Sequence, residues 1–309
     1  MKKEAVMSEL YSLQKLTERN IRLFLKDKMT VFFALLAPLI ALLLYFAFLR
    51  NIQLSGIKNL FSQGVDADEA LISGFIDMWL VSSVLAVSCM TVALNSMLVM
   101  VADKRDGKFK DFLVSPIKPY IITLSYFFAF FIVTVVIVLI IFALSCIYLA
   151  ATGSFHLSFN DFIEFLGIII LSCFSSVLIL TVIMGLFRSS SASGGFSGIF
   201  SSMIGFFTGA YIPINQFDTS LQYIANVLPG SHSAALLRNV LMRGVLDKLT
   251  KDMPDIVRET MAGEYSFSLN FFGKNIGTDA MYIYLAASVV VFFVVNLLVE
   301  RYKKKKMFM

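Results

Sequence analysis

The sequence predicts an all-α, polytopic membrane protein, on the basis of its composition, the length of its apolar runs and the placement of its charges. Of its 309 residues, 58% are hydrophobic and 15% are charged, whereas average proteins carry about 25% charged residues. Several uncharged runs reach the roughly 20 residues that a helix needs to cross a bilayer. We therefore expect one transmembrane domain over residues 1–309, with six membrane-spanning helices.

The expected spans are apolar runs bounded by charged or turn-forming segments, and they cover residues 30–49, 74–101, 120–150, 162–187, 196–212 and 280–299. Pro38 lies near the middle of the first span, where a proline removes a backbone hydrogen bond, and we expect a kink there. The second span is the most polar, with Asp77, Trp79, Ser82, Ser83, Ser88, Thr91, Asn95 and Ser96. Hydrogen bonds to a neighbouring helix are the favoured explanation of this polarity, and a water-lined path is the alternative.

Residues 8–28 precede the first span and predict an amphipathic helix that is too charged to cross the membrane. Its basic side chains follow steps of four, three and four residues, at Lys15, Arg19, Arg22 and Lys26. Such a helix is expected to lie along the inner membrane surface, where its cations approach anionic lipid head groups. The alternative, packing against a soluble domain, is weak because the sequence predicts no such domain.

A charged segment at residues 102–119 separates the second and third spans. Its five basic and three acidic residues cannot lie in hydrocarbon, where each charge costs about 2.5–3.5 kcal/mol on insertion scales. Apolar residues recur within it at helical spacing, and Ser115-Pro116 ends the pattern after Phe109, Phe112, Leu113 and Val114. The segment therefore predicts a short amphipathic docking helix, and a solvated loop between spans is the alternative.

The fifth span is rich in small residues, which allow helix backbones to approach closely. One set of four-residue steps contains Gly194, Gly198 and Ser202, and another contains Ser201, Gly205 and Gly209. A subunit interface and packing within one subunit explain this pattern equally well.

Residues 213–279 contain two apolar stretches of about ten residues, 217–227 and 232–242, separated by Pro229-Gly230. Neither stretch is long enough to span a bilayer alone, so we expect re-entrant or interfacial helices on the outer side. Residues 243–279 are polar and mixed in charge, and they predict an extracellular segment.

The distribution of positive charge predicts the orientation. Lys and Arg number seven in residues 1–28, five in 102–119 and five in 301–309, and with Arg188 they account for 18 of the 26 basic residues. Because basic residues favour the cytosolic side, both termini and segment 102–119 are expected in the cytosol, with the chain in the plasma membrane of a bacterial cell. The net charge of +5 follows from this topology and does not argue for nucleic acid.

The sequence lacks motifs for chemistry on this chain. No GxxxxGKS or GxxxxGKT phosphate loop occurs, so the chain is not expected to hydrolyse nucleotide itself. His156 and His232 have no cysteine or carboxylate at ligand spacing, so we expect neither a metal site nor a histidine-dependent nucleophile. The three cysteines all fall in apolar runs and predict packing residues. Ionisable residues in the spans are nearly confined to Asp77 and Glu164, which argues against an ion-coupled transporter.

Two stretches resemble the type-2 permeases of ATP-binding-cassette exporters. Residues 103–120, DKRDGKFKDFLVSPIKPY, are similar to the charged coupling helix of that family and the VSP sequence that ends it. Residues 206–238, FFTGAYIPINQFDTSLQYIANVLPGSHSAALLR, are similar to the family's region between its last two spans, with a G-x-x-x-P turn followed by a proline and an arginine. The predicted topology is similar to that of the family over the whole chain.

The resemblance implies a permease that pairs with a second, identical or different, permease chain and binds a separate ATPase subunit, which would hold ATP and magnesium. The coupling helix would contact the ATPase together with the interfacial helix, through Asp103, Lys104, Arg105, Asp106, Gly107, Phe109, Phe112 and Leu113. The second and fifth spans would border the export path or the subunit interface, at Ser83, Asn95, Gly198, Ser201, Gly205 and Gly209. An apolar path would suit a drug, a lipid-linked sugar or a hydrophobic peptide, and the chain itself would carry no cofactor.

Two other functions are compatible with a polytopic chain of this kind. One is an ion-coupled transporter, and the other is a membrane-embedded enzyme or scaffold whose polar second span forms a lipid-facing site. The enzyme needs a catalytic constellation within the spans, and the sequence shows none. An ATP-driven exporter is therefore the favoured hypothesis.

Overall fold

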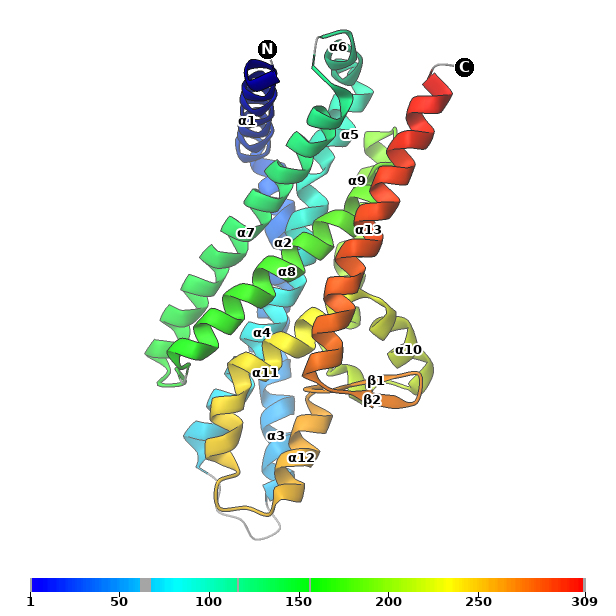
Figure 1. Cartoon of the computed structure of the whole chain (residues 1–309). Coiled ribbons are helices and arrows are strands. Elements are labelled where there is room, and N and C mark those ends of the chain that lie inside the picture. Colours follow the sequence, from blue (N-terminus) through cyan, green and yellow to red (C-terminus); the bar gives the residue numbers. More distant parts are fainter. Residues whose placement is uncertain (1, 62–67, 116, 156, 308–309) are drawn as a thin grey trace.

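The computed structural model describes residues 2–61, 68–115, 117–155 and 157–307, and it confirms the prediction of a mostly helical chain (Figure 1). The first half comprises α1 (Lys2–Lys26), α2 (Lys28–Leu44), a π-helical turn η1 (Tyr45–Leu49), α3 (Arg50–Phe61), α4 (Glu69–Ser96), α5 (Leu98–Arg105) and α6 (Lys108–Val114). The second half comprises α7 (Pro119–Ala151), α8 (Phe159–Met184), α9 (Ser190–Phe207), a 3-10 turn η2 (Ile214–Gln216), α10 (Thr219–Val227), α11 (Pro229–Leu249), α12 (Asp255–Glu264), β1 (Leu269–Phe271), β2 (Lys274–Ile276) and α13 (Thr278–Met307).

The helix α4 lies at the centre of the bundle, where nearly all of its side chains are buried. It packs against α2, α7, α8 and α11, which surround it in Figure 1. A helix enclosed in this way needs apolar or small side chains on every face. The composition of the second predicted span meets this need.

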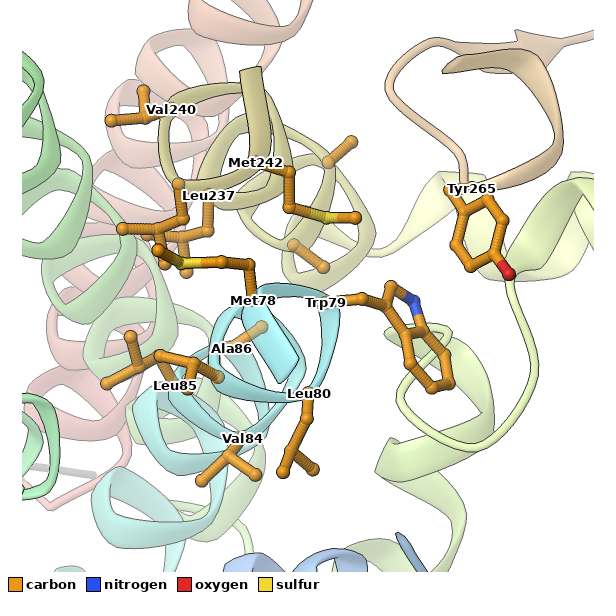
Figure 2. Packing of buried hydrophobic residues seen from close by; sticks show 14 of the residues in the cluster. Met78, Trp79, Leu80, Val84, Leu85, Ala86, Leu237, Val240, Met242 and Tyr265 are labelled. Carbon is orange, nitrogen blue, oxygen red and sulfur yellow. The ribbon is translucent and has the colours of Figure 1, made fainter. Parts of the chain in front are cut away.

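The largest hydrophobic cluster forms where α4 meets α11 (Figure 2). Met78 of α4 lies beside Leu237 of α11, and Trp79 extends toward Tyr265 in the segment after α12. The ring centroids of Trp79 and Tyr265 are 6.2 Å apart, with an edge-to-face angle of 82°. Because these side chains are buried and close-packed, they fix α11 against the central helix.

The polar side chains along the middle of α4 bond to their own helix. The hydroxyl groups of Ser88 and Thr91 donate to the carbonyl groups of Val84 and Val87, at 2.6 and 3.1 Å, and Asn95 Nδ2 donates to the Thr91 carbonyl at 2.9 Å. A short polar side chain in a helix reaches the carbonyl one turn earlier without any partner helix. The favoured prediction of hydrogen bonds to a neighbouring helix is therefore wrong for these three side chains.

In the described part of the chain, five helical stretches are long and apolar enough to cross a membrane, namely Lys28–Ile57, Glu69–Arg105, Pro119–Ala151, Phe159–Met184 and Thr278–Val299. The helix α9, which corresponds to the predicted span 196–212, is not among them. Its many serines and glycines lower its mean hydropathy. The count of six spans stays a prediction.

The first predicted span is a longer helix than its apolar run. Pro38 lies inside α2 and does not end it. The expected kink at Pro38 stays a prediction. A π-helical turn, η1, follows α2, and α3 then continues the helix beyond the predicted boundary at residue 49. The predicted polar segment that follows the first span therefore begins as a helix.

The outer segment is more ordered than its polar sequence predicts. The helix α11 begins at Pro229, a residue suited to the first helical turn, and continues past residue 242 to Leu249. It extends because Val245, Leu246 and Leu249 are buried and prolong its apolar face. The helix packs along α4 and α8, so its apolar face is covered by this chain.

The β1–β2 hairpin was not expected from the sequence. Its strands are antiparallel, with Leu269 paired to Ile276, and the chain reverses at Gly273, whose φ of +82° favours glycine. Asn226 Nδ2 donates to the carbonyl of Asn270 at 2.7 Å and so fastens the hairpin to the end of α10. The hairpin and α10 project together from one side of the helix bundle (Figure 1).

The helices α1 and α6 and the C-terminal end of α13 lie at one end of the molecule, and α3 and α12 lie at the other (Figure 1). We call these the α6 end and the α3 end. The three most basic segments of the sequence thus share one end, as a common location on the same side of a membrane requires.

The α4–α11 contact yields a stability prediction. Leu237 is fully buried, so Leu237→Ala removes apolar burial and leaves a cavity, at a cost of about 2–5 kcal/mol. We expect a clearly lower thermal unfolding midpoint of the purified chain in detergent, measured by fluorescence-detected gel filtration. Leu221→Ala, at a side chain of α10 that is 52% exposed, is the matched control. Equal shifts in the two variants would contradict the assignment of α11 to the core.

Candidate functional site

A partly open groove of about 760 Å³ lies between α2 and α9. Its walls come from α2, η1, α4, α5 and α9, together with residues just after α9, and none of the described residues that line it is charged. Phe33, Ile40 and Phe206 belong to its apolar walls, and Ser197 and Ser201 also line it. Both serine hydroxyl oxygens are buried without a hydrogen-bond partner among the described residues. The groove can therefore hold an apolar molecule.

The six residues predicted to border a path divide into two groups. Asn95, Gly198 and Ser201 line the groove. At Gly198, no heavy atom lies within 4 Å of the position of an added Cβ, so this part of the small-residue face is uncovered within the chain. Ser83 is not a groove residue, and its hydroxyl oxygen lies 3.5 Å from Nη2 of Arg238.

Gly205 and Gly209 are packed within the chain. An added Cβ on Gly205 would lie 2.4 Å from the ring of Tyr211. Gly209 has a φ of +69°, and its Cβ would lie 2.9 Å from Ile214. Packing within one subunit, one of the two explanations of the small-residue pattern, therefore accounts for these two glycines.

A buried carboxylate fixes η1 beside the groove. Asp77 Oδ1 accepts hydrogen bonds from Tyr45 Oη at 2.5 Å and from Tyr148 Oη at 3.3 Å, and it lies 3.5 Å from Nε of Arg50. Tyr45 begins the π-helical turn, Arg50 follows it, and Phe48 within it lines the groove. The sequence marks Asp77 as polar but does not reveal these partners, because they lie on other helices.

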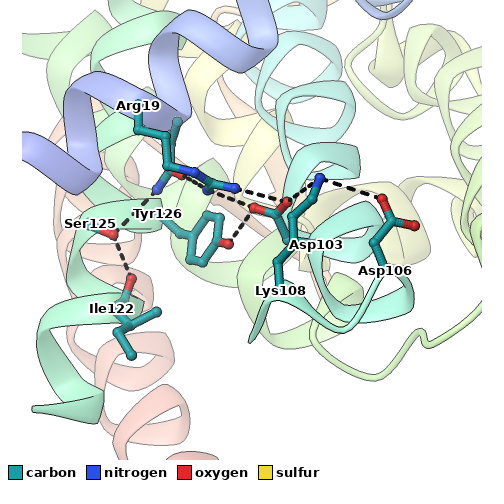
Figure 3. Close-up of polar contacts among 8 residues, drawn as sticks. Arg19, Asp103, Asp106, Lys108, Ile122, Ser125 and Tyr126 are labelled. Atoms are coloured by element: carbon teal, nitrogen blue, oxygen red, sulfur yellow. Dashed lines mark hydrogen bonds and ion pairs between the residues drawn. The ribbon is translucent and has the colours of Figure 1, made fainter. Parts of the chain in front are cut away.

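A second buried carboxylate joins four helices at the α6 end (Figure 3). Asp103 of α5 is 2% exposed and accepts hydrogen bonds from both terminal nitrogens of Arg19 in α1, at 2.7 and 3.0 Å. Tyr126 of α7 donates to the same carboxylate at 2.7 Å, and Nζ of Lys108 in α6 lies 3.5 Å away. Bidentate pairs of this kind are among the strong hydrogen bonds of proteins. This group therefore ties α1 to α5, α6 and α7.

The helix α6 has an inward and an outward side. The Arg19 guanidinium lies over the ring of Phe112, 5.0 Å from its centroid, and Phe112 packs against the hydrophobic cluster formed by α4, α5, α7 and α8. Val114 is 88% exposed. The side chains of Phe109 and Leu113, which were predicted to share the docking face, lie outside the described residues.

The remaining charged residues before α6 bond near the start of α9. Lys104 Nζ donates to a backbone carbonyl in the α8–α9 connection at 3.3 Å, and Arg105 Nη1 donates to the hydroxyl of the first residue of α9 at 2.9 Å. Arg105 Nε donates to Asp106 at 2.7 Å. Gly107, with a φ of +78°, makes the turn between α5 and α6. The end of α5, just before α6, is thus connected to α9, which lines the groove.

The four basic residues predicted on α1 have different surroundings. Arg19 points inward to the buried carboxylate, which departs from the expectation of a continuous lipid-facing row. Lys15 and Arg22 bond to the carboxylate of Glu18 on the exposed face, at 3.3 and 2.5 Å. With Lys26 they line a shallow pocket of about 400 Å³. Three of the four cations therefore remain on the outer face of α1.

The start of α1 is tied to the start of α7. Lys118 and Tyr120 bond to the carboxylate of Glu9, and these hydrogen bonds lower the pKa of the Glu9 carboxyl group. Asn20 Nδ2 donates to the hydroxyl of Ser125 at 3.3 Å. The helix α1 therefore packs along α7 over much of its length.

The structure gives no ligand set for a metal among the residues it describes. No group of three or more His, Cys, Asp or Glu residues is placed to hold an ion there. His232 is buried and stacked on Tyr284, and burial lowers its pKa to about 4, so the ring is neutral at pH 7. Cys89 and Cys173 are free and buried, with their sulfur atoms 3.7 Å apart. His156 lies outside the described residues.

Comparison with known proteins connects this arrangement to a family. A family model described as an ABC-2 family transporter protein matches residues 55–298, which is most of the chain. The chain belongs to the ABC-2 transporter family. This ABC-2 permease is a membrane subunit of an ATP-binding-cassette transporter and works with an ABC ATPase subunit. The match confirms the resemblance seen in residues 103–120 and 206–238. A comparison with curated proteins gives no significant match.

Gly205 of α9 is packed against Tyr211, whereas Gly198 of the same helix is uncovered within the chain, and this difference yields a prediction. Gly205→Ala forces the Tyr211 ring out of its place, so we expect the permease to lose about 1–3 kcal/mol of stability. Gly198→Ala meets open space and gains helix propensity, so its stability should be unchanged or up to about 1 kcal/mol higher. Thermal unfolding of both purified variants measures the difference. Equal midpoints would show that Tyr211 does not pack on α9.

The Arg19–Asp103 pair yields a second prediction. Arg19→Gln leaves a buried carboxylate without its bidentate partner, a change that costs about 3 kcal/mol. Arg22→Gln removes an exposed pair with Glu18 and should cost less than about 1 kcal/mol. We expect a lower unfolding midpoint for the permease with Arg19→Gln alone. A midpoint as high as that of Arg22→Gln would show that the pair does not hold α1.

Proposed function

We propose that this permease exports a hydrophobic or amphipathic molecule, driven by separate ABC ATPase subunits that hold ATP and magnesium. The observation that carries the proposal is the construction of the α6 end. There, a short helix with an exposed outer side contacts Arg19 of α1 and a hydrophobic cluster through Phe112, and Lys108 lies 3.5 Å from the buried Asp103 of α5. A docking helix must be firmly joined to the transmembrane helices if it is to transmit a force to them, and these contacts support that role for α6.

The proposed ATPase-binding surface consists of α6, the turn before it and the adjoining part of α1. Exposed Val114 supplies an apolar contact, and the partly exposed side chains of Arg105, Asp106 and Lys108 supply charged ones around it. Phe112 and Asp103 face inward and would act on the ATPase through the position of α6. A small apolar contact surrounded by charged groups is typical of a protein interface.

The groove between α2 and α9 is the proposed path or its wall. Its apolar lining and the absence of charge among its described residues suit a lipophilic drug, a lipid-linked sugar or a hydrophobic peptide. Ser197 and Ser201 offer hydrogen bonds to a polar group of such a molecule. Because the groove is open on one side, a second permease chain, identical to this one or different, would complete the enclosure.

The proposed topology places the α6 end in the cytosol and the α3 end outside the cell, in the plasma membrane of a bacterial cell. Both chain termini would then be cytosolic, in agreement with the basic composition of the segments at this end. The helix α9 would be the fifth of six spans, covered by the partner permease on its small-residue face. The helices α10 and α11 would lie at the outer membrane surface, and anionic lipid would contact the exposed cations of α1.

The docking surface is tested with Val114→Glu. Val114 makes an apolar contact at the surface of α6, so a charge there should reduce co-purification of the ATPase at least tenfold, without lowering the unfolding midpoint of the permease. The experiment is a mild-detergent pull-down of the tagged permease from its native membrane, with mass spectrometry of soluble proteins that carry a phosphate loop.

Ile256→Glu provides the matched control, because Ile256 is 65% exposed on α12 at the opposite end. It should leave ATPase co-purification unchanged. Retention of the ATPase by Val114→Glu would overturn the proposed surface. Purification of the wild-type permease alone, with transport that follows an ion gradient and not ATP, would overturn the proposed energy source.

A further inference from the structure

Arg238 is a fully buried cation in the interior of the bundle. It lies on α11, and its Nη2 atom donates to the carbonyl oxygens of Thr208 at 2.8 Å and Gly209 at 2.7 Å, at the end of α9. The hydroxyl oxygen of Ser83 on α4 is 3.5 Å from the same atom. This side chain of α11 therefore contacts both α4 and the end of α9, beside the groove.

No described carboxylate lies within ion-pair distance of Arg238, and its Nε and Nη1 atoms have no hydrogen-bond partner among the described residues. Burial lowers the pKa of Arg238 to about 9, which leaves the guanidinium charged at neutral pH. A buried, unpaired charge with unsatisfied donors destabilises a fold. Its compensation here is the C-terminal end of α9, where the helix dipole is negative and the last carbonyl groups lack donors.

The end of α9 has a backbone geometry that depends on this capping. The Ala210 amide donates to the carbonyl of Gly205 at 2.7 Å and the Gly209 amide to that of Phe206 at 3.0 Å, with Gly209 at positive φ. This is a Schellman motif, which reverses the chain after a helix. The reversal brings the ring of Tyr211 over Gly205. Of the carbonyl groups that remain, Phe207 accepts from the hydroxyl of Ser231 on α11 at 2.8 Å, and Thr208 and Gly209 accept from Arg238.

The residues just beyond this turn belong to the groove. Tyr211 and Ile212 both line it, and only Ala210 separates them from Gly209. The positions of Tyr211 and Ile212 therefore depend on the turn at Gly209. Arg238 of α11 bonds to the carbonyl groups of this turn. The helix α11 itself is fixed to α4 and α8 by its buried face. These contacts form a continuous connection from α11 through the turn to the groove.

We propose that Arg238 is a positioning residue that couples the outer helix α11 to the end of α9 and so sets the opening of the groove at Tyr211 and Ile212. That the groove carries a substrate rests on the proposed function, but the geometry of this contact does not. Both carbonyl oxygens accept from the same nitrogen, Nη2, whose two N–H groups are fixed in the plane of the guanidinium. A lysine keeps the charge and has donors enough, but it lacks this fixed planar geometry, so it should hold the turn less well than arginine.

The test measures how fast a membrane-impermeant maleimide labels a cysteine placed at Ile212, a side chain that is 40% exposed. The full chain is used in its native membrane with its partners, and Cys146→Ser removes the partly exposed native thiol. Arg238→Gln should raise the labelling rate of Ile212→Cys at least threefold, because the turn is released. Arg238→Lys should give a rate between those of Arg238→Gln and the parent, and an unchanged rate in both variants would overturn the proposal.

The control is Arg243→Gln on the same helix. Arg243 pairs with Asp161 and Glu164 on α8, so its loss weakens the fold without touching the α9 turn, and labelling of Ile212→Cys should stay at the parent rate. An equal rise with Arg243→Gln would reduce Arg238 to a general stabilising residue and overturn the proposal. Failure of both Arg238 variants to accumulate, while Arg243→Gln accumulates, would do the same.

The labelling result is independent of transport. If labelling rises as expected but no ATP-driven export is found, the proposed function fails and the coupling stands. If export is found but labelling is unchanged, the proposed function stands and the coupling fails.

Discussion

The burial of α4 on all sides is the constraint on which the rest of the structure depends. A helix with no exposed face needs neighbours all around it, and α2, α7, α8 and α11 provide them. The helix α11 is therefore part of the core, although in the described part of the chain it is not among the apolar stretches long enough to cross a membrane. The groove lies where the enclosure ends, between α2 and α9, at the edge of this central packing.

Two buried carboxylates anchor the N-terminal helices to the continuous segment formed by α4 and α5. Asp77 binds the π-helical turn near the α3 end, and Asp103 binds Arg19 at the α6 end. The helix α2 runs between these two anchors and supplies one wall of the groove. The elements before and after α2 are thus held by hydrogen-bonded charges. The described contacts of α2 itself with its neighbours are apolar. Apolar contacts are less directional than hydrogen bonds to charged groups.

The sequence predicts the helices of this fold well, because apolar runs of sufficient length and the charges between them are local signals. Three of the residues predicted to border a path or a subunit interface, Asn95, Gly198 and Ser201, line the groove, although a role in a path stays a prediction. The sequence does not predict the partners of Asp77, Asp103 or Arg238, since each contact joins residues far apart in the chain. The hairpin β1–β2 and the full length of α11 are missed because their sequences are short or mixed in polarity, and tertiary burial decides their structure.

The bonding of Ser88, Thr91 and Asn95 to their own backbone has a mechanical consequence. The hydrogen bonds that these three side chains donate stay within α4, so in the described part of the chain none of them donates to a neighbouring helix. A neighbouring helix that shifts along this part of α4 exchanges one set of dispersion contacts for another and breaks no hydrogen bond that these three side chains donate. The directional bonds between this central segment and the N-terminal helices come instead from Asp77 in α4 and Asp103 in α5.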